Sequence, residues 1–163
     1  MVVLKNILVA TDFSEPSTVA MAYGRDLARA YGATLHLLHV VEDISLRFGP
    51  EVGFFSTEMQ TDFEKRARRD LDAVITEDDR KTLTVMPVVE THVSVAHGVT
   101  NYAAANAIDL IIVGTHGRGA IKKFLMGSVA ERVVRTAPCP VLAVREHERE
   151  FIAPDALVAV ATA

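Results

Sequence analysis

Short apolar runs alternate with longer amphipathic stretches along this chain, and the alternation predicts strands separated by helices. Four of the runs are largely apolar throughout, which is typical of strands that are covered on both faces of a sheet. They span Ile7–Ala10, Ala33–Val41, Asp109–Val113 and Val141–Arg145. A further run from Thr84 to about Val95 contains Pro87, which cannot donate to a neighbouring strand, so this run is expected at a sheet edge.

The first two amphipathic stretches have recognisable starts and inner faces. Ser14 is placed to cap a helix that tolerates Pro16 in its first turn, and Gly32 is expected to end it. Its apolar residues at helical spacing are Val19, Tyr23, Leu27 and Ala30. Thr57 and Gln60 resemble a capping box at the start of a longer helix. The expected inner face of that helix comprises Met59, Phe63, Ala67, Leu71, Val74 and Ile75.

Two shorter helices complete the pattern. One is opened by Gly98 and runs through Ala107, and the other spans Val129–Thr136. Residues 42–56 carry acidic, glycine and proline signals and are interpreted as a loop. The order of strands and helices predicts an α/β fold, a doubly wound parallel sheet of five strands with helices on both faces.

Length and composition narrow the function without changing the fold. A chain of 163 residues is expected to form one domain, here residues 1–146, followed by a tail at 147–163. The formal net charge of -4 argues against nucleic acid or an anionic membrane as a partner. The opening residues lack the pattern of a signal peptide, and no run approaches 18 apolar residues. We therefore expect a cytoplasmic protein.

The strongest candidate for chemistry is a glycine-rich stretch that follows the fourth strand. Gly114, Gly117 and the pair Gly127-Ser128 are separated by two and nine residues. Glycines allow the backbone to approach a ligand closely, and a helix that starts after Ser128 offers unpaired N–H groups to an anion. The stretch predicts a phosphate site, and with it a nucleotide site.

Local charge supports the same prediction. Between Gly114 and Arg135 the chain has one acid, Glu131, and five bases, an excess that suits a phosphate in a protein of negative net charge. The bases are Arg118, Lys122, Lys123, Arg132 and Arg135. Taken singly, Lys122 and Lys123 are better explained as part of a solvated helix face.

The stretch differs from the common nucleotide fingerprints. No Gly-Lys-Ser/Thr follows the first glycines, which excludes a Walker A loop, and the order G-x-x-G-x-G is not that of the dinucleotide fingerprint. A response-regulator receiver also has an aspartate after its first strand, but with further acids beside it and a lysine after the fifth strand. Here Asp12 has no acidic neighbour among Thr11, Phe13 and Ser14, and the fifth strand ends at Arg145.

Asp12 itself allows two interpretations. It ends the first strand, which lies beside the fourth if the sheet reverses its order there. Its carboxylate could accept hydrogen bonds from ribose hydroxyls or ligate a metal. It could equally form a local Asx-turn or help to cap the next helix.

The histidines and the single cysteine add one candidate. His36 and His39 lie three apart in a strand, hence on opposite faces, and cannot hold a metal together. His116 lies inside the glycine-rich stretch and is the histidine that we expect to touch a ligand. Cys139 lies between two prolines without an evident base partner and is interpreted as an inert core thiol. The remaining histidines are expected at the surface or in satisfied positions: His92, His97 and His147.

On these residues the chain resembles the universal stress protein family, and within it the branch that binds ATP. The motif of that branch, G-x2-G-x9-G-[ST], is matched without a gap by Gly114, Gly117, Gly127 and Ser128. The resemblance extends from about Leu4 to Arg145 and includes the segments leading to Asp12 and Gly114 and the segment Ala137–Leu142. It implies a Rossmann-like sheet with strand order 3-2-1-4-5. It also implies ATP, ADP or AMP as the ligand, with magnesium or manganese as an optional companion of the phosphates.

The resemblance further implies roles for individual residues. Asp12 corresponds to the acid that contacts ribose, with Ala10 and Thr11 beside it. Adenine would lie against Val40 and Val41 at the end of the second strand. The ribose would be flanked by Val113 and Gly114 at the end of the fourth strand. The phosphates would be cradled by Gly117, Gly127, Ser128 and Val129, to which position and charge add His116 and Arg118.

Three functions remain open at this point. The first is a nucleotide-binding stress or regulatory protein, and the family implies that it is a homodimer joined through the strand Val141–Val144. The second is a slow ATPase or nucleotide hydrolase, for which only His116 or Asp12 could serve as a base, so we assign no catalytic residue. The third is an interaction module with an empty pocket, against which the unbroken glycine motif argues.

Overall fold

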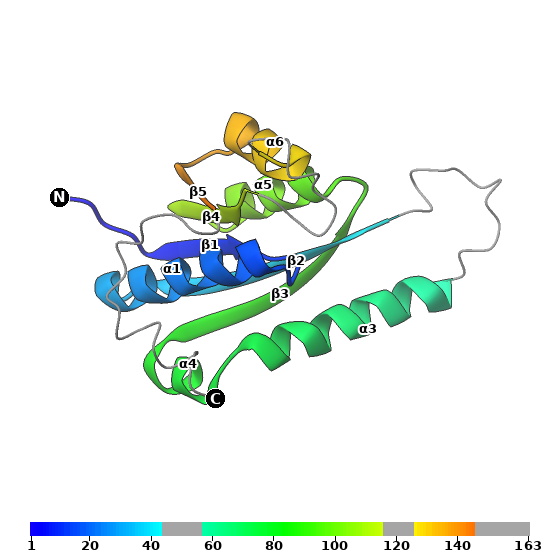
Figure 1. Ribbon diagram of the computed structural model, residues 1–163, viewed down its shortest axis with the longest axis horizontal. Helices are drawn as coiled ribbons and strands as arrows, with labels where there is room; N and C mark the ends of the chain where they lie inside the picture. Colours follow the sequence, from blue (N-terminus) through cyan, green and yellow to red (C-terminus); the bar gives the residue numbers. More distant parts are fainter. Residues whose placement is uncertain (44–56, 116–125, 146–163) are drawn as a thin grey trace.

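The protein is built around a sheet of five parallel strands in the order β3-β2-β1-β4-β5 (Figure 1). The computed structural model describes residues 1–43, 57–115 and 126–145. Its strands are β1 Asn6–Ala10, β2 Thr34–Glu42, β3 Thr84–His92, β4 Leu110–Gly114 and β5 Val141–Val144. Its helices are α1 Glu15–Tyr31, α3 Thr57–Val74, α4 Glu77–Thr82, α5 Val95–Ala105 and α6 Ser128–Thr136. The predicted topology is confirmed, including the position of the Pro87 strand at one edge.

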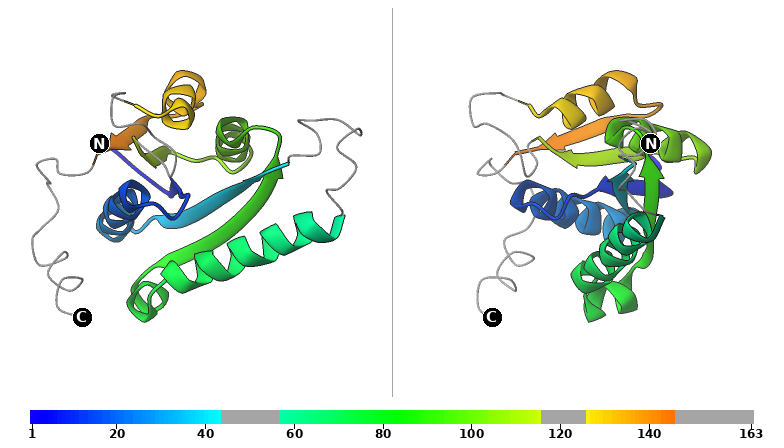
Figure 2. Two further views of the ribbon diagram at one scale, coloured as in Figure 1. Left: turned by 45° about the vertical axis from the view of Figure 1, so that its right-hand side comes forward. Right: turned by 90° about the vertical axis from the view of Figure 1, so that its right-hand side faces the viewer.

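Helices cover both faces of the sheet, as two further views show (Figure 2). Because side chains alternate along a strand, Ile7 and Val9 of β1 enter one buried cluster and Leu8 enters the other. The first cluster packs beneath α1 and α3, and the second beneath α5 and α6. The sheet is therefore doubly wound. Among the described residues no helix is both long and apolar enough to cross a membrane.

The first helix begins and ends where predicted, but with different contacts. Ser14 occupies the N-cap position without a side-chain capping bond, because its hydroxyl donates to Asp12 instead. Gly32 ends the helix in the left-handed region at φ 63°. Part of the buried face of α1 is shifted by one residue from the predicted face, and Ala30, which was predicted on that face, is exposed. The buried face consists of Ser17, Ala20, Met21, Tyr23, Gly24 and Ala28.

The inner face predicted for α3 holds for its C-terminal half and is wrong for its N-terminal half. Ala67, Leu71 and Ile75 are buried, whereas Met59 is 39% and Phe63 44% exposed. The helix packs against β2 and β3, and its N-terminal end extends beyond the sheet (Figure 1). The side chain of Thr57 lies outside the described part of the chain, so the predicted capping box stays a prediction; the Gln60 amide donates to Thr91 Oγ1 at 3.4 Å.

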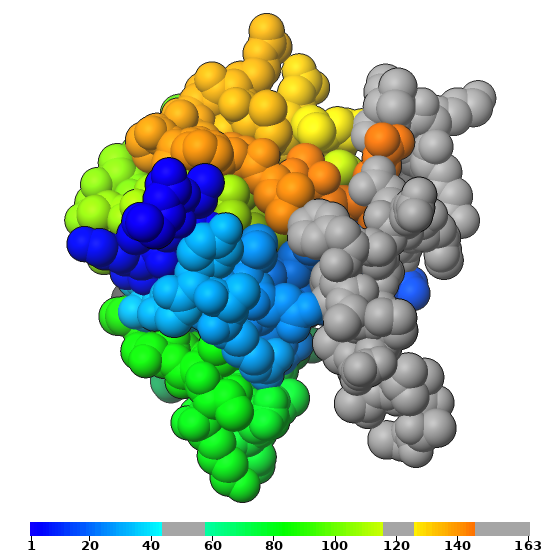
Figure 3. All heavy atoms as spheres, turned by 90° about the vertical axis from the view of Figure 1, so that its left-hand side faces the viewer, coloured from blue at the N-terminus to red at the C-terminus, as the bar shows by residue number. Residues whose placement is uncertain are grey.

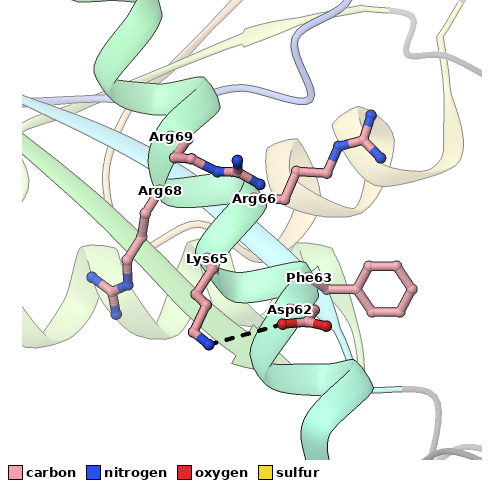
Figure 4. Close-up of a pocket in the computed structure, with 6 residues that line it drawn as sticks. All are labelled: Asp62, Phe63, Lys65, Arg66, Arg68 and Arg69. Carbon is pink, nitrogen blue, oxygen red and sulfur yellow. Dashed lines mark ion pairs between the residues drawn. The ribbon is translucent and has the colours of Figure 1, made fainter.

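The outward side of α3 carries a shallow concavity among charged side chains. Figure 4 shows the Phe63 ring extending away from the helix beside them. The lining residues are Asp62, Phe63, Lys65, Arg66, Arg68 and Arg69. Lys65 pairs with Asp62 at 3.9 Å and Arg66 with Asp70 at 4.0 Å. Since one helix supplies every lining residue and two of the four bases are paired with acids of the same helix, we interpret this surface as a solvated helix face.

The region around Gly98 and one short helix differ most from prediction. β3 ends at His92 and α5 begins at Val95, so Gly98 lies inside the helix and does not open it. Its missing side chain allows α5 to approach β2, since a Cβ there would lie 2.8 Å from Val40 Cγ1. The short helix α4 was not predicted, although Thr76 and Asp79 form a reciprocal capping box at its start.

Candidate functional site

The residues predicted to bind a ligand gather where the strands end. Ala10 of β1 is paired in register with Val113 of β4, and the chain order reverses between these two neighbours. In open parallel sheets, ligands bind at such a switch point, outside the carboxyl ends of the strands. Ala10, Thr11, Asp12, Val113 and Gly114 therefore lie at one place in the fold.

Val40 and Val41 lie further along β2, beyond Leu38, the β2 residue paired with the end of β1. Both are buried, at 7% and 9% exposure. Val40 packs in the apolar cluster beneath α5, and Gly98 of α5 lies against the Val40 side chain. Its side chain is thus part of the core, and a contact of this segment with a ligand would have to involve its backbone or Val41.

The structure shows that Asp12 forms the local turn that the sequence allowed. The Ser14 N–H donates to Asp12 Oδ1 at 3.1 Å, and the Ser14 hydroxyl donates to the same oxygen. This is the Asx-turn geometry, with Phe13 between the two residues in the left-handed region at φ 62°. The turn leaves Asp12 half-buried at the end of β1, so ribose contact remains a prediction.

Thr11 anchors this turn to the sheet. It is buried, and its N–H donates to Leu38 O at 2.9 Å. Its hydroxyl accepts the Phe13 N–H at 3.0 Å and lies 3.1 Å from the Ser17 hydroxyl. The Thr11 hydroxyl is thus engaged within the turn, and a ligand contact of this residue stays a prediction.

Gly114 has a packing role that the sequence did not indicate. A Cβ on this residue would lie 2.8 Å from the carbonyl carbon of Pro16 and 2.9 Å from its oxygen. Backbone atoms of the first turn of α1 therefore occupy the space that a side chain would need. The glycine permits this close crossing of α1 over β4, independently of any ligand.

Two hydrogen bonds fix the start of α6 above the end of β4. Thr115 N–H donates to Val144 O at 2.8 Å, and Gly127 N–H donates to Thr115 O at 2.6 Å. Gly127 is the N-cap of α6 and has no side chain with which to satisfy the first N–H groups of the helix. These donors and the positive end of the helix dipole therefore lie next to the switch point, as an anion site requires.

A groove of about 960 Å³ runs from this helix start along α6. It is bordered by the end of β2, by the connection from β3 to α5, and by one side of α6. Its lining residues are Glu42, Val93, Ser94, Val95, Ala96, Ser128, Val129, Glu131, Arg132, Arg135 and Thr136. Two of the predicted phosphate residues, Ser128 and Val129, are thus placed at a concave surface. Arg135 is paired with Glu131 at 3.3 Å, so Arg132 is the more available cation of the two.

The remaining predicted residues cannot be placed in this site. His116, Gly117 and Arg118 lie outside the described residues, as do Lys122 and Lys123. Within residues 1–43, 57–115 and 126–145, no group of three or more His, Cys, Asp or Glu could hold a metal ion.

The two strand histidines lie on opposite faces, as predicted. His36 Nδ1 is 2.8 Å from the Tyr102 hydroxyl on α5, and burial lowers the pKa of His36 below its ordinary value. His39 Nδ1 is 2.8 Å from Thr11 O, and its ring packs against Phe13. Sequence reasoning missed this second contact, because nothing along the chain indicates that β2 would touch the turn after β1.

Cys139 lies at the second cluster as a partly buried thiol. Burial and the nearby Asp109 raise the pKa of its thiol. The protonated thiol is a poor nucleophile, which agrees with its interpretation as inert.

Comparison with known proteins identifies the family. The profile of the universal stress protein family matches residues 4–145. A universal stress protein of Thermus aquaticus is 31% identical, over 86% of this chain and 98% of its own. A solved structure of one from Methanocaldococcus jannaschii is 26% identical, with a TM-score of 0.72, over 93% of this chain and 100% of that chain.

Two more distant structures of the same fold contain adenine nucleotides. A universal stress protein in complex with cAMP is 20% identical, with a TM-score of 0.61, over 88% of this chain and 98% of that chain. One from Archaeoglobus fulgidus in complex with dAMP is 17% identical, with a TM-score of 0.61, over 88% and 99%. The profile match covers most of the residues, and the sheet order and the Thermus relative agree with it. This chain belongs to the universal stress protein family.

Proposed function

We propose that this protein binds an adenine nucleotide, ATP in the first place, and acts in stress response or regulation through it. The observation that carries the proposal is the start of α6, where the uncapped N-terminal N–H groups lie beside the switch point. Asp12 at the end of β1 would accept the ribose hydroxyls. Gly117, Gly127, Ser128 and Val129 would cradle the phosphates, with His116 and Arg118 close by. The cAMP and dAMP complexes of related proteins support adenine as the base.

A metal ion would be held mainly by the nucleotide. The described residues contain no cluster of three metal ligands, so a magnesium or manganese ion would be bound together with the phosphates. There it would supply charge neutralisation.

The proposal predicts that freshly purified protein releases an adenine nucleotide on denaturation, detected by mass spectrometry. Protein freed of nucleotide should bind ATP with micromolar affinity, equivalent to about 8 kcal/mol. In Gly127→Val we expect that affinity to fall tenfold or more, about 1.4 kcal/mol, because a branched side chain would stand where the phosphates approach. Gly127 has φ −70° and ψ 153°, which valine also adopts, so the backbone need not change.

Ala137→Val is the matched control for that experiment. Ala137 is the C-cap of the same helix, with φ −62° and ψ 142°. It places the same side chain far from the helix start and should leave ATP affinity within about twofold. Equal calorimetric affinities of Gly127→Val and wild type would refute the phosphate site.

We further expect the protein to bind ATP much better than it hydrolyses it. Two carboxylates at the site are already engaged, since Asp12 accepts two bonds from Ser14 and is assigned to the ribose, and Glu131 is paired with Arg135. Water activation and alignment normally supply much of the rate, so turnover should be far below the enzyme median of about 10 per second. Phosphate release measured on ATPase-free protein is the test. Release at about one per second or faster, abolished by Asp12→Ala, would establish the alternative function of an ATPase.

A homodimer is the expected assembly. β5 is the outermost strand at one side of the described sheet, and three of its four apolar residues are only half-buried. Its outer backbone N–H and C=O groups would therefore be available for pairing with a second copy of the chain. In the space-filling view the orange atoms of this region form part of the visible surface (Figure 3). Light scattering at tens of micromolar protein should give twice the monomer mass of 17.7 kDa. A monomer mass across that concentration range would contradict the assignment of β5 as an interface.

A further inference from the structure

The turn that carries Asp12 is held from β2 by a residue that the ligand motif does not include. His39 lies in β2 immediately after Leu38, the residue in register with the end of β1. We propose that His39 and Phe13 form a positioning pair for Asp12, and that this pair determines how strongly the protein prefers ribonucleotides to 2′-deoxyribonucleotides. The inference rests on the adenine-nucleotide function proposed above.

The first contact of the pair is a hydrogen bond to the backbone of the turn. His39 Nδ1 is 2.8 Å from Thr11 O, and a carbonyl oxygen can only accept, so Nδ1 carries the proton and donates. On its other side, Thr11 N–H donates to Leu38 O at 2.9 Å. Both polar backbone groups of Thr11 are thus held by consecutive residues of β2.

This bond bears directly on Asp12 because of peptide geometry. The Thr11 carbonyl and the Asp12 N–H belong to one planar unit. Fixing the carbonyl oxygen therefore fixes the orientation of the Thr11–Asp12 peptide plane, and with it the direction in which the chain enters Asp12. A rotation of that plane would move the carboxylate relative to the switch point.

The second contact is between rings. The Phe13 and His39 ring centroids are 4.7 Å apart with planes inclined at 30°. Phe13 has φ 62°, a region that large side chains rarely adopt, so the ring contact helps to retain a turn that the residue alone would disfavour. The turn brings back Ser14, whose N–H and hydroxyl both donate to Asp12 Oδ1. The carboxylate is oriented as a consequence.

Orientation of a carboxylate matters most for a ligand hydroxyl. Hydrogen bonds weaken steeply when their angles deviate, whereas phosphates would be held by groups on α6 that take no part in this cluster. Disturbing the pair should therefore weaken recognition of the ribose 2′-hydroxyl while leaving phosphate recognition largely intact. A purely structural role would weaken both equally.

The test is the ratio of the dissociation constants of 2′-deoxy-ATP and ATP, measured by calorimetry on nucleotide-free protein. A bond to a charged group predicts a ratio of about tenfold or more in the wild type. In His39→Leu, which keeps bulk but has no donor, the ratio should fall to about threefold or less through loss of ATP affinity. His39→Gln retains an amide donor and should restore most of the ratio. Phe13→Gly removes the ring and should lower the ratio independently.

His36→Leu is the matched control, because His36 lies in the same strand but faces α5 and pairs with Tyr102. It should lower the melting temperature without changing the ratio. An unchanged ratio in His39→Leu and Phe13→Gly, or an equal loss of affinity for both nucleotides, overturns the inference. A wild type that binds both nucleotides equally also overturns it while leaving the proposed function intact. A wild type that binds neither refutes the proposed function itself.

Discussion

Replacing Asp79 with alanine is expected to lower the free energy of unfolding by about 3–5 kcal/mol, the usual cost of removing one partner of a buried ion pair. Asp79 is 2% exposed, and its partner Arg25 of α1 has a side chain that is 20% exposed. Arg25 Nε lies 2.9 Å from each carboxylate oxygen, and its Nη2 donates to Val74 O at 2.7 Å. The pair therefore ties α1 to α4 and to the end of α3, and alanine would leave Arg25 without its partner.

The same carboxylate also holds the start of α4. Its Oδ2 accepts the Thr76 N–H at 2.9 Å, and the Asp79 N–H donates to Thr76 Oγ1 at 3.0 Å. Burial by itself would raise the pKa of Asp79, but hydrogen bonds from Arg25 and Thr76 and the charge of Arg25 outweigh it and lower the pKa below 3.8. A carboxyl whose pKa is lowered on folding stabilises the fold above its unfolded pKa, and this contribution is lost as the pH falls through the folded value.

Urea unfolding provides the measurement, with Asp78→Ala as control. Asp78 is adjacent, and its carboxylate pairs with Arg29 at 2.7 Å with the side chain 69% exposed, so its loss should cost less than about 1 kcal/mol. Asp79→Asn should be less stable than the wild type at pH 7, and this difference should shrink below about pH 4. Equal stability of Asp78→Ala and Asp79→Ala, or a difference that does not depend on pH, would contradict the role of the pair.

Replacing Gly114 with alanine is the second large expected effect, a destabilisation of about 1–3 kcal/mol. The added Cβ would lie within 2.9 Å of three atoms of Pro16, two of them backbone, so α1 would have to move away from β4. Gly98→Ala is the comparison. There the nearest atoms belong to the Val40 side chain, and the gain in helix propensity of about 1 kcal/mol offsets part of the clash.

Thermal unfolding should therefore rank Gly114→Ala below Gly98→Ala. A Gly114→Ala protein as stable as the wild type would show that α1 can shift at little cost. Measuring ATP affinity on the folded variant separates the two reasons for this glycine. If its main role is packing, stability should fall more than binding does.

Much of the fold followed from local patterns. Continuous apolar runs, Gly32 as a helix end and Pro87 as an edge signal each depend on the residues immediately around them, and all three predictions agree with the structure. Boundaries were less predictable. Gly98 has the features of a helix start, but a close approach to Val40 explains it, and that contact joins residues 58 positions apart.

The apolar pattern misled where polar side chains make the contact with the sheet. Met59 and Phe63 continue the apolar stripe of α3, yet both are exposed, and at this end of the helix Gln60 and Glu64 contact Thr91 of β3. Helix α4 is six residues long, too short for a periodic signal, and a half-buried arginine from α1 contributes to its stability.

The features of the candidate site likewise fall into those that the sequence determined and those that depend on the tertiary structure. By itself the sequence determined which strand lies at the sheet edge, the spacing of the glycines and a helix that begins within one residue of Ser128, because backbone freedom and helix ends depend on residue type. Only the tertiary structure decided what Gly114 accommodates, that Asp12 forms a turn with Ser14, and that His39 reaches Thr11. Each of these depends on distances between segments that the chain brings together only when the sheet forms, and residue order alone contains no measure of such distances.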